Sequence, residues 1–156
     1  MDRVMKLCED LGLEQTVLRR KMHDLDARRQ GIENLTSAAD MGKLLHLVHK
    51  QSLPNEEVSL LSSFVSRQTI ALMRECRDGM GIMRHIPWTM SCAHQSGQLE
   101  AMGEHPAVTH DMGIVDATGG TYTLAIFVQD PESVTAGERL IGEIGRDVYQ
   151  QVLYTP

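Results

Sequence analysis

The stretch Ala93-His94-Gln95-Ser96-Gly97-Gln98, followed by His110-Asp111-Met112-Gly113-Ile114-Val115, carries most of the information about the fold. Short apolar alternations and β-branched residues are typical of strands, and here they predict strands over residues 90–94, 107–117 and 121–129. The turn between the last two contains consecutive glycines, which supply the positive φ values that tight hairpins need. These two strands should therefore form an antiparallel hairpin.

The first half of the chain has the apolar spacing of helices. One helix is predicted over residues 2–11, with Gly12 where a left-handed C-terminal cap is usual. Ser37 caps the clearest helix start, and Asp40 stands three residues later, as in a capping box. A short helix is also expected within residues 13–34.

Two more helices are predicted from residues that interrupt the chain and from the spacing of apolar residues. Pro54 interrupts the chain, and Asn55 is expected to cap a helix with an apolar face formed by Val58, Leu61, Phe64 and Val65. Residues 70–83 contain Gly79 and Gly81, so any helix there should be short or broken. The last helix should begin near Val134, with an apolar stripe formed by Leu140, Ile141, Ile144, Val148 and Val152.

The order of these elements predicts an α+β fold, in which helices pack on a three-stranded antiparallel sheet and a C-terminal helix completes the core. The chain has 156 residues, of which 42% are hydrophobic and 23% charged, as in a single domain. Residues 1–86 should form its mainly helical part, and residues 87–156 the strands and the last helix.

Charge and cysteine content exclude several classes of protein. A net charge of −6 gives no positive surface for nucleic acid or an anionic membrane, so neither is expected as a partner. Three cysteines without CxxC spacing suggest neither a disulfide framework nor a metal site, and no cofactor is implied. Without a signal peptide at Met1, the sequence as given predicts a cytoplasmic protein.

Several segments, taken in order, resemble the C-terminal half of class A β-lactamases and related penicillin-binding serine hydrolases. They are Leu18–Asp24, Glu33–Met41, the strand with His94-Gln95-Ser96-Gly97, the strand His110–Val115, Tyr122–Val128 and the last helix. The resemblance implies that this chain is part of a β-lactamase-like fold, and that the family's first helices and strands would precede Met1. Relatives in this family are usually exported, in contrast to the cytoplasmic prediction.

The resemblance also implies a degenerate substrate-binding strand. Gln95, Ser96 and Gly97 stand where the family has Lys-Thr/Ser-Gly. A hydroxyl at Ser96 could hydrogen-bond a substrate carboxylate, and Gly97 lets a substrate backbone come close. Gln95 cannot supply the positive charge of the lysine.

The family's catalytic motifs are missing from these 156 residues. No serine precedes a lysine by three positions, because the lysines follow, at that spacing, Arg3, Leu18, Asp40 and Leu47. Neither asparagine belongs to a Ser-x-Asn motif, so no catalytic residue is assigned. The leading hypothesis is a truncated or degenerate serine hydrolase domain for β-lactam or peptidoglycan-like acyl substrates, inactive on its own.

The alternative is a non-catalytic binding or oligomerisation module on the same scaffold. An unpaired sheet edge recruits partner strands, so either hypothesis predicts a homo-oligomer or a complementing N-terminal half as partner, beside a small acyl substrate. An upstream segment with Ser-x-x-Lys would favour the enzyme.

Three other groups of residues are weaker candidates for a catalytic or metal site. His94, Ser96, His110 and Asp111 could form a hydrolytic triad, but alternation puts His110 and Asp111 on opposite faces of a strand, which favours ordinary sheet residues. Cys92 is more readily explained as a structural thiol than as a nucleophile. His46 and His49, three residues apart, could offer one edge of a zinc site but lack further ligands in a matching pattern.

Overall fold

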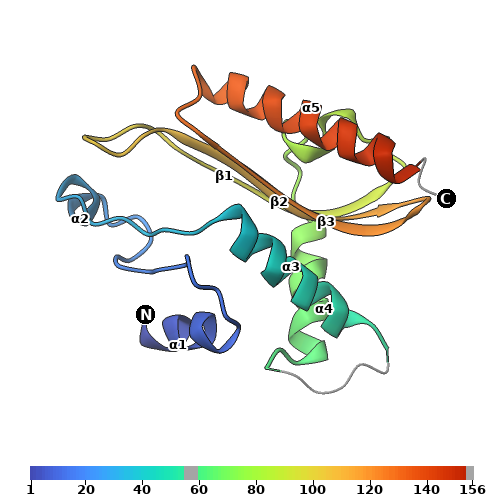
Figure 1. The fold of residues 1–156 in the computed structure, drawn as a ribbon, viewed down its shortest axis with the longest axis horizontal. Coiled ribbons are helices and arrows are strands. Elements are labelled where there is room, and N and C mark those ends of the chain that lie inside the picture. The colour runs from blue at the N-terminus through green and yellow to red at the C-terminus, as the bar shows by residue number, and fades with distance from the viewer. Residues whose placement is uncertain (55–59, 154–156) are drawn as a thin grey trace.

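A three-stranded sheet with helices on both faces forms the centre of the molecule (Figure 1). The computed structural model describes residues 1–54 and 60–153. The sheet has the order β1-β2-β3, and both pairs are antiparallel. Its strands are β1 (Ser91–Leu99), β2 (Val108–Ala117) and β3 (Gly120–Gln129). The α+β fold and the three-stranded antiparallel sheet predicted from the sequence are confirmed.

Figure 1 shows helices α3 (Ala38–Ser52) and α4 (Ser63–Arg74) on one face of this sheet and α5 (Val134–Leu153) on the other. A short 3-10 helix, η1 (Ile82–His85), packs beside α5. The remaining helices, α1 (Asp2–Asp10) and α2 (Leu25–Arg29), lie near the N-terminus, away from the middle of the sheet. The first helix was predicted within one residue, and Gly12 after it has a φ of 66°, as a left-handed cap requires.

Alternation along the strands gives each face of the sheet its own core. On the α5 side the buried cluster is Ile82, Ile86, Val115, Ile126, Ile141 and Tyr149. On the α3 and α4 side it is Leu45, Val48, Ile70, Ala93 and Ile114. The neighbouring residues Ile114 and Val115 therefore pack into the cores on opposite faces of the sheet.

The hairpin forms as predicted, but β1 is longer than its apolar pattern. Ala117 pairs with Gly120, and Gly120, directly after the two-residue turn, has a φ of 133°, a conformation that favours glycine. The predicted first strand ended at His94, whereas β1 continues to Leu99, which pairs with Val108. The polar residues after His94 therefore owe their strand conformation to hydrogen bonding with β2.

The predicted capping box at α3 is half formed. Ser37 accepts a hydrogen bond from the backbone N–H of Asp40 at 3.1 Å. The Asp40 carboxylate turns instead to the N-terminal segment, where it accepts from the Gln15 N–H at 2.8 Å and the Thr16 hydroxyl at 2.6 Å. This residue therefore joins α3 to the chain that precedes it.

Helix α4 buries a different face from the one predicted. Asn55 and Val58 lie outside the described residues, and Ser62 caps the helix by accepting from the Val65 N–H at 3.2 Å. Because the helix begins at Ser63, it turns Ser66 and Ile70 inward, while Phe64 and Val65 are 66% and 52% exposed. It ends at Arg74, before Gly79 and Gly81, and the short η1 follows these glycines, as predicted for residues 70–83.

The start of α5 was predicted correctly, but its buried stripe only in part: Ile141 is buried, and Val148 and Val152 are half-buried. Leu140 and Ile144 are exposed, while the buried residues are Gly137, Ile141, Gly142, Gly145 and Tyr149. A Cβ on Gly142 would lie 2.7 Å from Arg84 Cδ, so glycine lets the helix come close to η1. Apolar spacing does not reveal a helix face that packs through its glycines.

Across the described part of the chain, no helix has both the length and the apolar character needed to span a bilayer.

Gly42 offers a stability test because it lies inside α3 with no atom within 4 Å of a Cβ placed there. We expect Gly42→Ala to raise the free energy of unfolding by roughly 0.5–1 kcal/mol, since alanine has the higher helix propensity. Urea denaturation measures the change. The matched control is Gly145→Ala in α5, where a Cβ would lie 3.1 Å from the Ile82 carbonyl oxygen and should be neutral or destabilising. Equal stabilisation by both variants would contradict this packing.

Candidate substrate-binding site

The predicted substrate strand lies at an edge of the sheet, because β1 pairs only with β2 among the described strands. Alternation directs Gln95 and Gly97 to the α3 and α4 side, together with the buried Ala93. Ser96 faces the α5 side. The Gln95 side chain is exposed, and its amide donates to the Ser96 carbonyl at 2.9 Å, so it folds back on its own strand.

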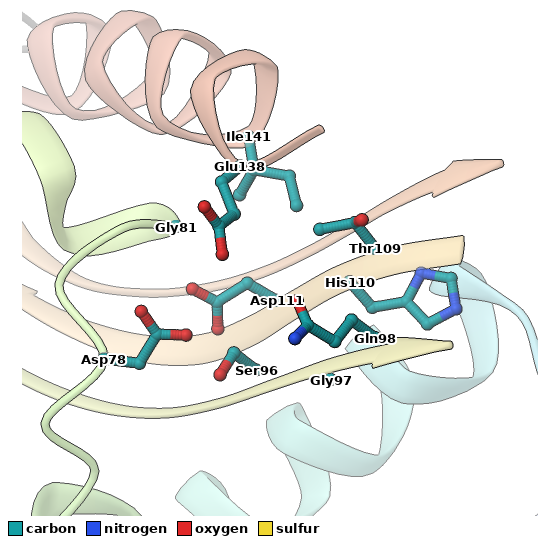
Figure 2. Close-up of a pocket in the computed structure, with 10 residues that line it drawn as sticks. All are labelled: Asp78, Gly81, Ser96, Gly97, Gln98, Thr109, His110, Asp111, Glu138 and Ile141. Carbon is teal, nitrogen blue, oxygen red and sulfur yellow. The ribbon is translucent and has the colours of Figure 1, made fainter. Parts of the chain in front are cut away.

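A cavity of about 270 Å³ lies beside β1, between the sheet and α5 (Figure 2). Its lining residues are Asp78, Gly81, Ser96, Gly97, Gln98, Thr109, His110, Asp111, Glu138 and Ile141. Ser96 and Gly97 are thus brought together at one cavity, whereas Gln95 is not part of its lining. No described atom lies within 4 Å of a Cβ placed on Gly97, so the space over this glycine is open.

His94 and Asp111 form a buried pair below the cavity. His94 Nδ1 lies 3.1 Å from Asp111 Oδ1, and Asp111 Oδ2 accepts from the Ile82 N–H at 2.8 Å. Burial lowers the pKa of His94, but the hydrogen bond and charge of Asp111, with the charge of Asp78, outweigh it and raise the pKa above its ordinary value. A side chain on Gly81 would collide with the Asp111 carboxylate, so this glycine lets the loop approach.

The pair does not extend to a hydrolytic triad. Ser96 is opposite Asp111 in the strand register, and its hydroxyl hydrogen-bonds Asp78. No hydrogen bond joins this serine to a histidine within the described ranges. His110 lies on the other face of β2, where its ring stacks on Phe127 with 4.1 Å between centroids, as the alternation argument predicted.

The other chemical groupings are also structural in character. Burial, chiefly, raises the pKa of the Cys92 thiol to about 12, so the reactive thiolate is scarce at neutral pH. His46 is exposed on α3, and no group of three His, Cys, Asp or Glu side chains in the described residues is placed to hold a metal ion.

Two acidic residues of the cavity, Asp78 and Glu138, were missed by the sequence analysis. Asp78 comes from the loop between α4 and η1, and Glu138 from the first turns of α5. A hydrogen bond from Ser96 and another from the Met80 N–H lower the pKa of Asp78, aided by the charge of His94 and opposed by burial. The glycines around Asp78 predict a loop, but no local pattern shows where this loop docks.

The three-stranded antiparallel sheet with a helical layer on each face is the fold expected from the β-lactamase-like resemblance. The model of the β-lactamase enzyme family matches residues 1–152, so the chain belongs to that family. No curated protein sequence matches the chain.

Solved structures share the fold at low sequence identity. The β-lactamase of Sphaerobacter thermophilus DSM 20745 is 22% identical with a TM-score of 0.81, over 99% of this chain and 54% of that one. PBP-A is 23% identical with a TM-score of 0.79, over 99% and 52% of the two chains. A class A β-lactamase representative from Bacteroides cellulosilyticus DSM 14838 is 21% identical with a TM-score of 0.77, over 97% and 53%. The chain thus spans about half the length of the solved structures that it matches.

Proposed function

We propose that this chain forms the substrate-binding wall of a β-lactamase-like serine hydrolase, acting on β-lactam or peptidoglycan-like acyl compounds. The observation that carries the proposal is the edge position of β1, where Ser96 faces a cavity on the α5 side and the space over Gly97 on the α3 and α4 side is open. An edge strand offers main-chain N–H and C=O groups to a substrate amide, and a residue without a side chain lets that amide come near. A PBP-A variant described as an acyl-enzyme complex with penicillin G is a relative in fold for which this chemistry is on record.

We further propose that the chain is truncated or degenerate and does not acylate by itself. The 156 residues contain no Ser-x-x-Lys motif, and Gln95 replaces the family's cationic lysine with a neutral amide. A complementing N-terminal half would supply the serine nucleophile and its base beside the open edge of β1. A non-catalytic module has no supporting observation in the described residues and is not proposed.

Intact-mass spectrometry tests the missing nucleophile. The purified chain is incubated with a fluorescent penicillin and with a serine-directed phosphonate, and its mass is compared before and after. We expect no adduct from the folded protein. A stable adduct at any residue would show that a nucleophile is present and would overturn this part of the proposal.

Substrate binding at β1 is tested with the methyl ester of penicillin G, a neutral probe, by following amide resonances in NMR. We expect shifts at Ser96, Gly97 and Gln98. Gly97→Val should weaken the binding at least about tenfold without unfolding the chain, because the new side chain would fill the open space on the α3 and α4 side of the edge strand, where the probe would lie over Gly97.

Ser91→Val is the matched control for this substitution. It adds valine to the same face of β1, six residues away, which is about 20 Å along a strand. The control should bind the ester like the unaltered chain. Equal loss in both variants, or ester-induced shifts only at sites remote from β1, would contradict the proposed site.

A further inference from the structure

Figure 1 shows α3 and α4 on the face of the sheet opposite α5, and a second cavity lies on that face, bordered by the β2–β3 hairpin. Its volume is about 450 Å³. Its described lining residues are His49, Ser52, Leu53, Arg67, Ile70, Arg74, Ile114, Asp116 and Thr121. Asp116 pairs with Ser91 in the sheet, six residues before Gly97, so this cavity lies about 20 Å along β1 from the proposed substrate position.

The spacing along α4 directs a mixed set of side chains to this cavity. Arg67, Ile70 and Arg74 are at positions i, i+3 and i+7, so they share one face of the helix. Ile70 and Ile114 belong to the buried core on this side of the sheet and form an apolar wall of the cavity. Both arginines are exposed. The cavity therefore combines an apolar wall with two guanidinium groups that solvent can reach.

Only one of these guanidinium groups has a counter-charge. Arg74 Nη2 donates to Asp116 Oδ2 at 3.1 Å, and the Thr121 hydroxyl donates to Asp116 Oδ1 at 3.0 Å. Both oxygens of this carboxylate are thus in use, and Asp116 is the only acid of the described lining. Arg67 makes no hydrogen bond or ion pair within the described residues. One positive charge therefore remains uncompensated at the cavity.

The backbone at the end of α3 does not supply the missing counter-charge. The His49 carbonyl accepts from the Ser52 hydroxyl at 2.6 Å, and the Lys50 carbonyl accepts from the Leu53 N–H at 3.1 Å. Because these acceptors already have donors, the Arg67 guanidinium is available to a ligand. A guanidinium binds a carboxylate through two parallel hydrogen bonds, and an apolar wall favours a ligand with an apolar body.

We infer that this cavity binds a monocarboxylate with a compact apolar body. The carboxylate pairs with Arg67, and the apolar body packs on Ile70 and Ile114. A single negative charge is expected because one guanidinium is left without a counter-charge. The inference goes beyond the proposed function, since it assigns a separate site that depends neither on a nucleophile nor on the edge of β1.

Methyl NMR on the 156-residue chain, with labelled isoleucine δ1 groups, tests the inference. The probes are 3-phenylpropionate, its neutral amide and inorganic phosphate, an anion without an apolar body. We expect 3-phenylpropionate to shift the methyl resonances of Ile70 and Ile114 but not those of Ile82 and Ile141, which lie in the core on the α5 side. The amide and phosphate should each bind at least about tenfold more weakly.

Arg67→Gln should reduce the affinity for 3-phenylpropionate to that of the amide. The fold should persist, with the other methyl resonances unchanged, because Arg67 is exposed and has no partner to lose within the described residues. The control is Arg139→Gln, which removes the same charge from the exposed side of α5, on the other face of the sheet. It should bind the carboxylate like the unaltered chain. Equal losses in the two variants would assign binding to net charge and overturn the inference.

Three further results would also overturn it. Equal affinity for the carboxylate and its amide would show that Arg67 does not recognise the anion. Equal affinity for the carboxylate and phosphate would show attraction to surface charge alone. No shift at Ile70 and Ile114 would show that the cavity does not bind the probe. None of these results concerns the penicillin ester at β1, so the proposed function is tested separately.

Discussion

Asp111→Ala is expected to lower the free energy of unfolding by about 3–5 kcal/mol, because it removes one partner of a fully buried pair. The carboxylate joins three segments, since it binds His94 on β1 and the Ile82 N–H on η1 from its own place on β2. Without it, a buried imidazole and a buried N–H are left without an acceptor. Whole domains are stable by only about 5–15 kcal/mol, so this loss should be visible directly in urea denaturation.

The control for this variant is Asp116→Ala, near the other end of β2. Asp116 pairs with Arg74 at 3.1 Å, but both side chains are substantially exposed, at 39% and 51%. Exposed pairs of this kind contribute about 0–1 kcal/mol. Asp111→Asn, which keeps the shape and one acceptor oxygen, should fall between the two. If Asp111→Ala lowered the free energy of unfolding no more than Asp116→Ala, the buried His94–Asp111 pair would not be what stabilises the contact between β1, β2 and η1.

Glu33→Gln is expected to have a comparable effect at the opposite end of the chain. Glu33 accepts from Arg20 Nε and from Arg28 Nε, each at 2.8 Å, and all three residues are buried. Arg28 also donates to the Glu100 carbonyl at 2.6 Å, which ties the N-terminal segment to the end of β1. Removing the only acid of this cluster leaves two buried guanidinium groups without a counter-charge, at a cost of about 3–5 kcal/mol.

The acid response of the same residue provides a second measurement. Burial raises the pKa of Glu33, but the Asn34 N–H and the two arginines more than compensate, so the pKa lies below its ordinary value of 4.5. A group with a depressed folded-state pKa stabilises the protein above its unfolded-state pKa and loses that contribution as the pH falls through the folded-state value. The stability difference between the unaltered chain and Glu33→Gln should therefore be full at pH 6 and shrink below about pH 4.5.

Glu9→Gln is the matched control, because Glu9 is exposed and its contact with Lys6 is long, at 3.5 Å. It should change stability little at any pH. A stability difference for Glu33→Gln that stayed constant down to pH 2 would show that the cluster does not stabilise the fold through the ionised carboxylate.

The sequence correctly predicted those features that depend only on residues a few positions apart in the chain. The paired glycines set the hairpin, Ser37 set the start of α3, and alternation along β2 set which side chains meet each core. In each case a backbone conformation or a side-chain direction depends on near neighbours alone, so the physical cause is present in the local sequence.

Only the tertiary structure decided the features that depend on distant partners. β1 extends through its polar residues because β2 supplies the hydrogen bonds, and α5 packs through glycines because η1 comes within contact of it. The cavity likewise joins Asp78, Ser96 and Glu138, which are far apart in sequence and acquire their common chemistry only when a loop, a strand and a helix converge. The sequence by itself determined that the edge strand carries the neutral Gln95, whereas the packing of the chain brings the carboxylates of Asp78 and Glu138 to that strand.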